Sequence, residues 1–200
     1  GAAVVATAAP EFNTRGNRFK ALTYAELTPD QRTFADREIA AGRKPETGPF
    51  NIYLRSPEMA DLSRPFSDYL RFKAPEPRKF KEIAIMLTSR YWGGQYVWYS
   101  HRQQALDAGL SAAFIDAMAA GARPANMTPE EAVVLDFCEQ LLATRQVDDA
   151  NFKAMAGRFG ERGIVELVGL MGQYHTLSML FAIDRYPLPE GARQEIDKPK

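Results

Sequence analysis

Residues 80–101 read FKEIAIMLTSRYWGGQYVWYSH, and this stretch predicts two consecutive helices joined by a glycine break. Glu82 lies near the start of the first helix, and His101 lies two turns into the second. If the two helices pack antiparallel after Gly93-Gly94, these side chains can approach each other. The chain has two histidines and one cysteine, so few other groups can exchange protons near neutral pH. The pair is either an acid–base unit or a buried structural pair.

Helix signals dominate the rest of the chain. Thr28-Pro29-Asp30 is an N-terminal cap with proline at the first helical position, and Thr128-Pro129-Glu130-Glu131 is a capping box. No segment shows a sustained two-residue alternation, so we expect no substantial sheet. The sequence therefore predicts an all-α, single-domain bundle of about eight helices. Their expected limits are about 29–41, 57–73, 78–91, 95–108, 112–121, 129–145, 149–157 and 161–183.

The chain length of 200 residues suits one domain with its own core. We expect a flexible N-terminal tail over 1–20, a helical domain over 21–192 and a C-terminal tail over 193–200. The start, GAAVVATAA, is small and apolar. It is compatible with the end of a secretory signal, with a flexible tail or with a cloning scar. We expect a cytoplasmic protein, or an exported one if this start is the remnant of a signal peptide.

Composition argues against several kinds of partner and cofactor. Formal net charge is zero, so no strong field favours nucleic acid or an anionic membrane, and no apolar run is long enough to span a bilayer. No histidine or cysteine stands at metal-ligand spacing, and no glycine-rich phosphate loop follows a strand. We therefore expect no metal and no cofactor. The lone Cys138 lies in an apolar helical run, which favours a buried structural thiol.

Several side chains near the glycine break are candidates for binding a small organic acid. Arg90, Arg102 and Tyr96 could hold a carboxylate, because guanidinium groups bind carboxylates with two parallel hydrogen bonds. Trp98 and its aromatic neighbours suit an apolar pocket wall or a subunit interface. Each of these residues could equally serve packing or surface ion pairs. His175, on the last helix, is expected in the core or an interface, with the same pocket as an alternative.

The stretch from Phe80 to Ser111 resembles the carboxymuconolactone decarboxylase family, which is similar in fold to the alkylhydroperoxidase D family. In these families a Glu is followed twelve residues later by a Cys-x-x-Cys pair, and a His comes four residues after the second Cys. Here Glu82 and His101 match the Glu and His, whereas Gly94 and Val97 occupy the cysteine positions. The C-terminal words ELVGLMGQYH (166–175) and PLPEGA (187–192) also look like the family, and the resemblance covers roughly residues 50 to 192.

The resemblance implies a cofactor-independent carboxy-lyase that decarboxylates a small lactone or related acid in aromatic-compound catabolism. His101 would be the general acid, Glu82 its orienting partner, and Arg90 a carboxylate ligand. An alkylhydroperoxidase-type, peroxiredoxin-like activity is disfavoured, because Gly94 and Val97 supply no thiol. A non-enzymatic helical oligomer remains the third alternative. The resemblance also implies self-association, commonly as a trimer or hexamer.

Overall fold

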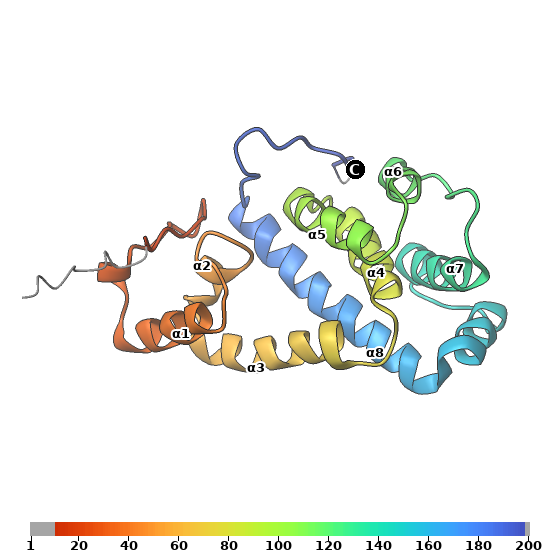
Figure 1. Cartoon of the computed structure of the whole chain (residues 1–200), viewed down its shortest axis with the longest axis horizontal. Coiled ribbons are helices and arrows are strands. Elements are labelled where there is room, and N and C mark those ends of the chain that lie inside the picture. Colours follow the sequence, from red (N-terminus) through yellow and green to blue (C-terminus); the bar gives the residue numbers. More distant parts are fainter. Residues whose placement is uncertain (1–10, 199–200) are drawn as a thin grey trace, which may run out of the picture.

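The computed structural model describes residues 11–198, and within that range the chain is helical and contains no strand (Figure 1). The prediction of an all-α protein is therefore confirmed. The α-helices are α1 (Pro29–Ala40), α2 (Phe50–Tyr53), α3 (Pro57–Asp68), α4 (Arg78–Tyr91), α5 (Gln95–Asp107), α6 (Ala112–Ala120), α7 (Pro129–Thr144) and α8 (Asp149–Asp184), with a 3-10 turn η1 (Tyr24–Glu26) and a π-helical turn η2 (Tyr69–Lys73).

Side-chain caps place the helix starts where the sequence predicts them. The Thr128 hydroxyl accepts a hydrogen bond from the Glu131 amide at 3.2 Å, and the Asp148 carboxylate accepts one from the Asn151 amide at 2.8 Å. The break predicted before residue 161 is present inside α8, where Gly160 has φ 69° and ψ 171°. The one-turn helix α2 was not predicted, because the sequence before it indicates an extended connector.

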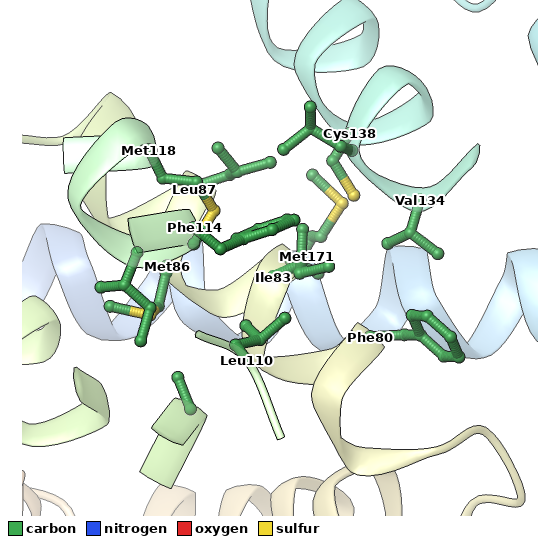
Figure 2. Packing of buried hydrophobic residues seen from close by; sticks show 14 of the residues in the cluster. Phe80, Ile83, Met86, Leu87, Leu110, Phe114, Met118, Val134, Cys138 and Met171 are labelled. Atoms are coloured by element: carbon green, nitrogen blue, oxygen red, sulfur yellow. The ribbon is translucent and has the colours of Figure 1, made fainter. Parts of the chain in front are cut away.

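Helix α4 lies at the centre of the fold, as its apolar circumference predicts. Its side chains are buried without interruption from Phe80 to Ser89. It packs against α5, α7 and α8. Figure 1 shows α8 running across the middle of the molecule beside α4 and α5. The core between α4, α6, α7 and α8 is filled by aliphatic, aromatic and sulfur-containing side chains, among them Met171 and Cys138 (Figure 2). Burial of this kind stabilises the fold by about 25 cal/mol per Å² of apolar surface.

The apolar stripe predicted for residues 57–73 is only partly buried. Leu70 is 3 % exposed, but Leu62 is 79 % exposed on the surface of the chain. The ring of Phe66 lies beside Gly169, so the outer face of α3 adjoins α8. The exposed apolar side chains of the two helices are together called the α3/α8 patch below: Met59, Leu62, Phe66, Val165 and Val168.

Both ends of the described chain contact the helical body. The Asp184 carboxylate accepts hydrogen bonds from the amides of Asn17 at 3.1 Å and Phe19 at 2.6 Å, and Ile196 is buried in the core. The limits predicted for the tails stay predictions, and residues 1–10, with the apolar start, lie outside the described residues. In the described range, no helix is long and apolar enough to cross a membrane.

Candidate active site

Glu82 and His101 form a buried hydrogen-bonded pair. The Glu82 Oε2 atom lies 2.8 Å from His101 Nδ1, and the two residues are 2 % and 4 % exposed. Helix α4 carries the carboxylate and α5 the imidazole, and Gly93, with φ 61°, reverses the chain between them. The contact predicted from the two helix faces is therefore present.

Tyr174, on α8, extends this pair to a chain of three residues. Its hydroxyl lies 3.0 Å from His101 Nε2, and its ring meets the imidazole edge to face, with centroids 5.1 Å apart. Sequence reasoning missed Tyr174 because it is 73 residues from His101 along the chain. The only signal was its place beside His175 in the family-like word GQYH.

Burial shifts the pKa values of His101 and Tyr174. Desolvation lowers the pKa of His101 below its usual 6.5, while the hydrogen bond and charge of Glu82 oppose that shift. Desolvation also raises the pKa of Tyr174 well above its usual value. In the neutral form His101 donates its Nδ1–H to Glu82 and accepts the Tyr174 hydroxyl proton at Nε2. The pair of contacts thus fixes one tautomer.

His101 and Tyr174 line a cavity of about 420 Å³, called the His101 cavity below. A volume of this size suits a small organic ligand. Its walls come from α5 and α8 on one side, and from α2, α3, η2 and the loop that follows α1 on the other. Tyr96 also lines the cavity, as the sequence analysis expected of a pocket residue, and its hydroxyl accepts a hydrogen bond from the Gly48 amide at 2.7 Å.

Cationic side chains line the His101 cavity, and no acidic side chain does. Two of the cations are neutralised nearby: Arg43 lies 2.6 Å from Asp68, and Arg64 lies 2.8 Å from Glu38. The other two cations, Lys44 and Arg71, have no ion-pair partner in residues 11–198, and Arg71 donates instead to the neutral amide of Gln104 at 2.9 Å. The cavity therefore carries a net positive charge beside His101.

Three of the predicted binding residues lie outside this cavity wall. Arg90 contacts the carbonyl of Ala119 on α6, Trp98 donates its indole N–H to Glu195 at 3.0 Å, and Arg102 lies 2.8 Å from Asp116. On α5, Trp98 and Arg102 each follow a cavity residue by one position, which turns their side chains about 100° away. The structure thus places Lys44 and Arg71, rather than Arg90 and Arg102, in the wall of the His101 cavity.

Comparisons with known proteins define the fold. Neither protein-family models nor curated sequences match this chain. An uncharacterized peroxidase-related protein from Ralstonia eutropha, described as an alkylhydroperoxidase AhpD core, superposes with a TM-score of 0.70 at 17 % identity, over 91 % of this chain and 95 % of that one. The chain has the alkylhydroperoxidase D-like fold. A protein of unknown function from Agrobacterium tumefaciens, whose name places it with the antioxidant-defence protein AhpD, matches at a TM-score of 0.61 and 19 % identity over 72 % of this chain and 99 % of that one.

Within this alkylhydroperoxidase D-like fold, the single thiol lies away from the His101 cavity. Cys138, on α7, is fully buried in the apolar core and labelled there in Figure 2. Burial raises the pKa of its thiol far above the usual value, so it stays protonated. His175 is also elsewhere: its Nδ1 accepts the Trp92 indole N–H at 2.7 Å. In residues 11–198 no group of three or more acidic, histidine or cysteine side chains could hold a metal.

Proposed function

We propose that this protein is a cofactor-independent lyase that decarboxylates a small organic acid, of the lactone type handled by carboxymuconolactone decarboxylases, by acid–base chemistry at His101. The observation that carries this proposal is the Glu82–His101–Tyr174 chain, with contacts of 2.8 and 3.0 Å, at the wall of a cavity that bears unpaired cations. A buried carboxylate–imidazole pair at such a wall is suited to proton transfer.

The unpaired cations indicate the substrate class. Lys44 and Arg71 offer two positive charges to the His101 cavity, and aromatic side chains such as Tyr96 and Phe181 supply apolar wall. This combination suits a compact, unsaturated acid with two negatively charged groups, since a guanidinium holds one carboxylate in fixed orientation. Lys44 is the more exposed of the two, so we place it at the cavity mouth and Arg71 near the reacting end.

The chemical step consumes one proton. The C–C bond to the leaving carboxylate breaks, carbon dioxide departs, and the electron pair passes onto the conjugated carbonyl of the substrate. A carbon of the resulting enolate then takes a proton from the enzyme, and solvent restores this proton to the enzyme. When His101 is protonated, both ring N–H groups donate, to Glu82 and to the Tyr174 oxygen. The Tyr174 O–H is then released to point into the cavity, so the proton can pass from His101 through Tyr174 to carbon.

This arrangement predicts a rate that falls as pH rises. The acid form is the His101 imidazolium, and its pKa is lowered by burial. The acid is therefore fully populated only below that pKa, and kcat/KM should decrease through a transition that lies below pH 6.5. Initial rates across a pH series would check this, with the melting temperature recorded at each pH. A rate that increases through this range would contradict the assignment of His101 as the acid.

Peroxide reduction is the alternative that the names of the structural neighbours suggest. It needs an accessible thiolate and a resolving thiol. Gly94 and Val97 stand at the cysteine positions of the family pattern, and Cys138 is buried and protonated. We therefore disfavour that activity for this chain.

Alkylation should leave the proposed activity intact. Because Cys138 does not reach the His101 cavity, we expect iodoacetamide-treated protein and Cys138→Ala protein to keep their decarboxylation rates within about twofold, as for a substitution outside the active site. Mass spectrometry would report the extent of alkylation. Loss of all activity in both samples would contradict a thiol-free mechanism.

The proposed function is tested by a panel of small acids. The intact protein is incubated with unsaturated lactone acids and related dicarboxylates, and released carbon dioxide is measured; a parallel assay follows hydroperoxide reduction with a dithiol donor. We expect carbon dioxide from at least one dicarboxylate and no thiol-dependent peroxide loss. Peroxide reduction without decarboxylation would favour the alkylhydroperoxidase-type alternative. The absence of both activities would favour a non-enzymatic helical oligomer.

Self-association is proposed from the α3/α8 patch. Large exposed apolar side chains on two adjoining helices are candidates for an interaction surface. We propose that a second copy of the chain covers the patch, in a homo-oligomer such as a trimer or hexamer.

One substitution in the patch should dissociate this assembly. Leu62→Asp would place a charge at its most exposed apolar side chain, and we expect the oligomer seen by light scattering at micromolar concentration to become a monomer. Phe152→Asp, in the first turn of α8 and outside the patch, is the matched control and should not change the mass. A wild-type protein that is strictly monomeric would contradict the proposal.

A further inference from the structure

A second, smaller hollow lies at the start of α5. It encloses about 160 Å³ and is lined by the Gly93-Gly94 turn, the first turn of α5 and the last turns of α8. Since a water molecule occupies about 30 Å³ of liquid, the hollow has room for a ligand of a few heavy atoms. It is separate from the His101 cavity, with which it shares the wall formed by Tyr96, Val97 and Phe181.

Several hydrogen-bond donors that line the hollow have no acceptor among the described residues. Gly94 caps α5 without a side chain, and the amides of Tyr96 and Val97 have no acceptor in residues 11–198, inside the helix or beyond it. Ser178, on α8, is 1 % exposed and lines the same hollow, yet its hydroxyl has no hydrogen-bond partner in that range. A buried unpaired hydroxyl is costly, which indicates that a ligand atom completes its bonding.

The charge around the hollow is positive. The N-terminus of the 13-residue helix α5 contributes the equivalent of roughly half a positive charge. Arg185, at the left-handed end of α8, lines the hollow and has no ion-pair partner in residues 11–198. No acidic side chain lines it. These features together match a ligand with about one negative charge.

We propose that this hollow is a binding site for a short monocarboxylate, with its carboxylate held by the α5 amides, Ser178 and Arg185. The walls decide between a carboxylate and an inorganic oxyanion. Trp92, Tyr96, Phe181 and Tyr186 give the hollow an aromatic surface that suits a short hydrocarbon chain. A phosphate dianion would carry more negative charge than the positive groups around the hollow neutralise. It would also make no apolar contact with the aromatic surface.

The open space depends on Gly94. A Cβ atom at this position would lie 3.1 Å from the Ser89 hydroxyl and 3.7 Å from the Ser178 hydroxyl, so any side chain would enter the hollow. The Ser89 hydroxyl is already used, because it donates to the Gly94 carbonyl at 2.7 Å. Ser178 is therefore the side-chain hydroxyl free to meet a ligand here. The site does not depend on the proposed decarboxylation.

The test is a titration of the intact protein with propionate at constant ionic strength. Binding is followed by the fluorescence of Trp92, which lines the hollow, and by the NMR cross-peaks of the Tyr96 and Val97 amides. We expect saturable binding that Ser178→Ala and Arg185→Gln each weaken roughly tenfold, the loss typical of a hydrogen bond to a charged group. Ser178→Ala should melt at an equal or higher temperature, because it removes an unpaired buried hydroxyl.

Two controls assign the signal to this hollow. Arg145→Gln changes an arginine in the same left-handed position at the end of α7, outside the hollow, and should bind propionate as the wild type does. Arg71→Gln removes a cation of the His101 cavity and should also leave the signal unchanged. Absence of saturation, binding that survives both Ser178→Ala and Arg185→Gln, loss of the signal in Arg71→Gln, or phosphate that binds as tightly as propionate would each overturn the assignment.

Discussion

Replacement of either His101 or Glu82 should lower turnover by roughly two to four orders of magnitude, which is the usual contribution of a positioned general acid. In the proposed mechanism His101 carries the proton, and Glu82 holds the imidazole at 2.8 Å in the tautomer that meets Tyr174. Because the two act as one unit, the double variant should lose little more than either single variant. The variants are His101→Ala, Glu82→Gln and the pair, compared by steady-state rates on the acid identified in the panel.

Stability measurements separate catalysis from folding in these variants. His101→Ala leaves the buried Glu82 carboxylate without its imidazole partner, which can destabilise a protein by about 3–5 kcal/mol. His101→Asn is the matched variant, because its amide N–H can still donate to Glu82. We expect His101→Asn to remain folded and to turn over at least a hundredfold more slowly than the wild type. If these variants melt at lower temperature but keep near-normal turnover, the pair is structural and the acid–base assignment is wrong.

Tyr174→Phe should lower kcat by roughly a hundredfold while changing KM by less than about twofold. The substitution keeps the ring that packs against His101 and removes only the hydroxyl that we propose passes the proton. The cavity cations Lys44 and Arg71, which we propose bind the substrate, are untouched, so substrate affinity should persist. Rates over a range of substrate concentrations would resolve kcat from KM.

The control for this variant is Tyr53→Phe. Tyr53 also lines the His101 cavity, but its hydroxyl is hydrogen-bonded to Ser63 at 2.9 Å and not to His101. A hydroxyl deletion of this kind typically costs about 1 kcal/mol of stability, so both variants should melt at slightly lower temperature. Equal kcat values in the two variants would show that Tyr174 only packs against the imidazole.

The Glu82–His101 contact could be predicted from the sequence because it depends on local information. Both residues stand on adjacent helices joined by a two-glycine turn, and helical periodicity alone selects the faces that meet. The fold class was equally accessible, since capping residues and prolines mark the helix starts. The resemblance to the decarboxylase family indicated the same pair.

The rest of the site depends on contacts between distant segments. Tyr174 comes from α8, and the unpaired cations Lys44 and Arg71 come from the loop after α1 and from η2. No periodicity predicts which of these segments closes over α5. Sequence reasoning therefore chose the nearest cations along the chain, Arg90 and Arg102, and both of these contact residues of α6 instead.

The apolar stripe over residues 57–73 is less buried in the structure than the sequence predicts, for a related reason. Hydrophobic periodicity identifies an apolar face but not the molecule that covers it. Within a single chain, the turn that carries Leu70 packs against α4 and α8, whereas the Leu62 side chain is exposed to solvent. The same pattern thus contributes to the core at one end and to the proposed subunit contact at the other.

Decarboxylation in D₂O is the most direct measurement of the central proposal that His101 delivers a proton to carbon. The wild-type protein should release carbon dioxide and yield a product with one deuterium at the enolate carbon that accepts the proton. Folded His101→Asn protein should form this product at least a hundredfold more slowly, in keeping with the loss of a general acid. A folded His101→Asn protein that forms the deuterated product at the wild-type rate would contradict the account.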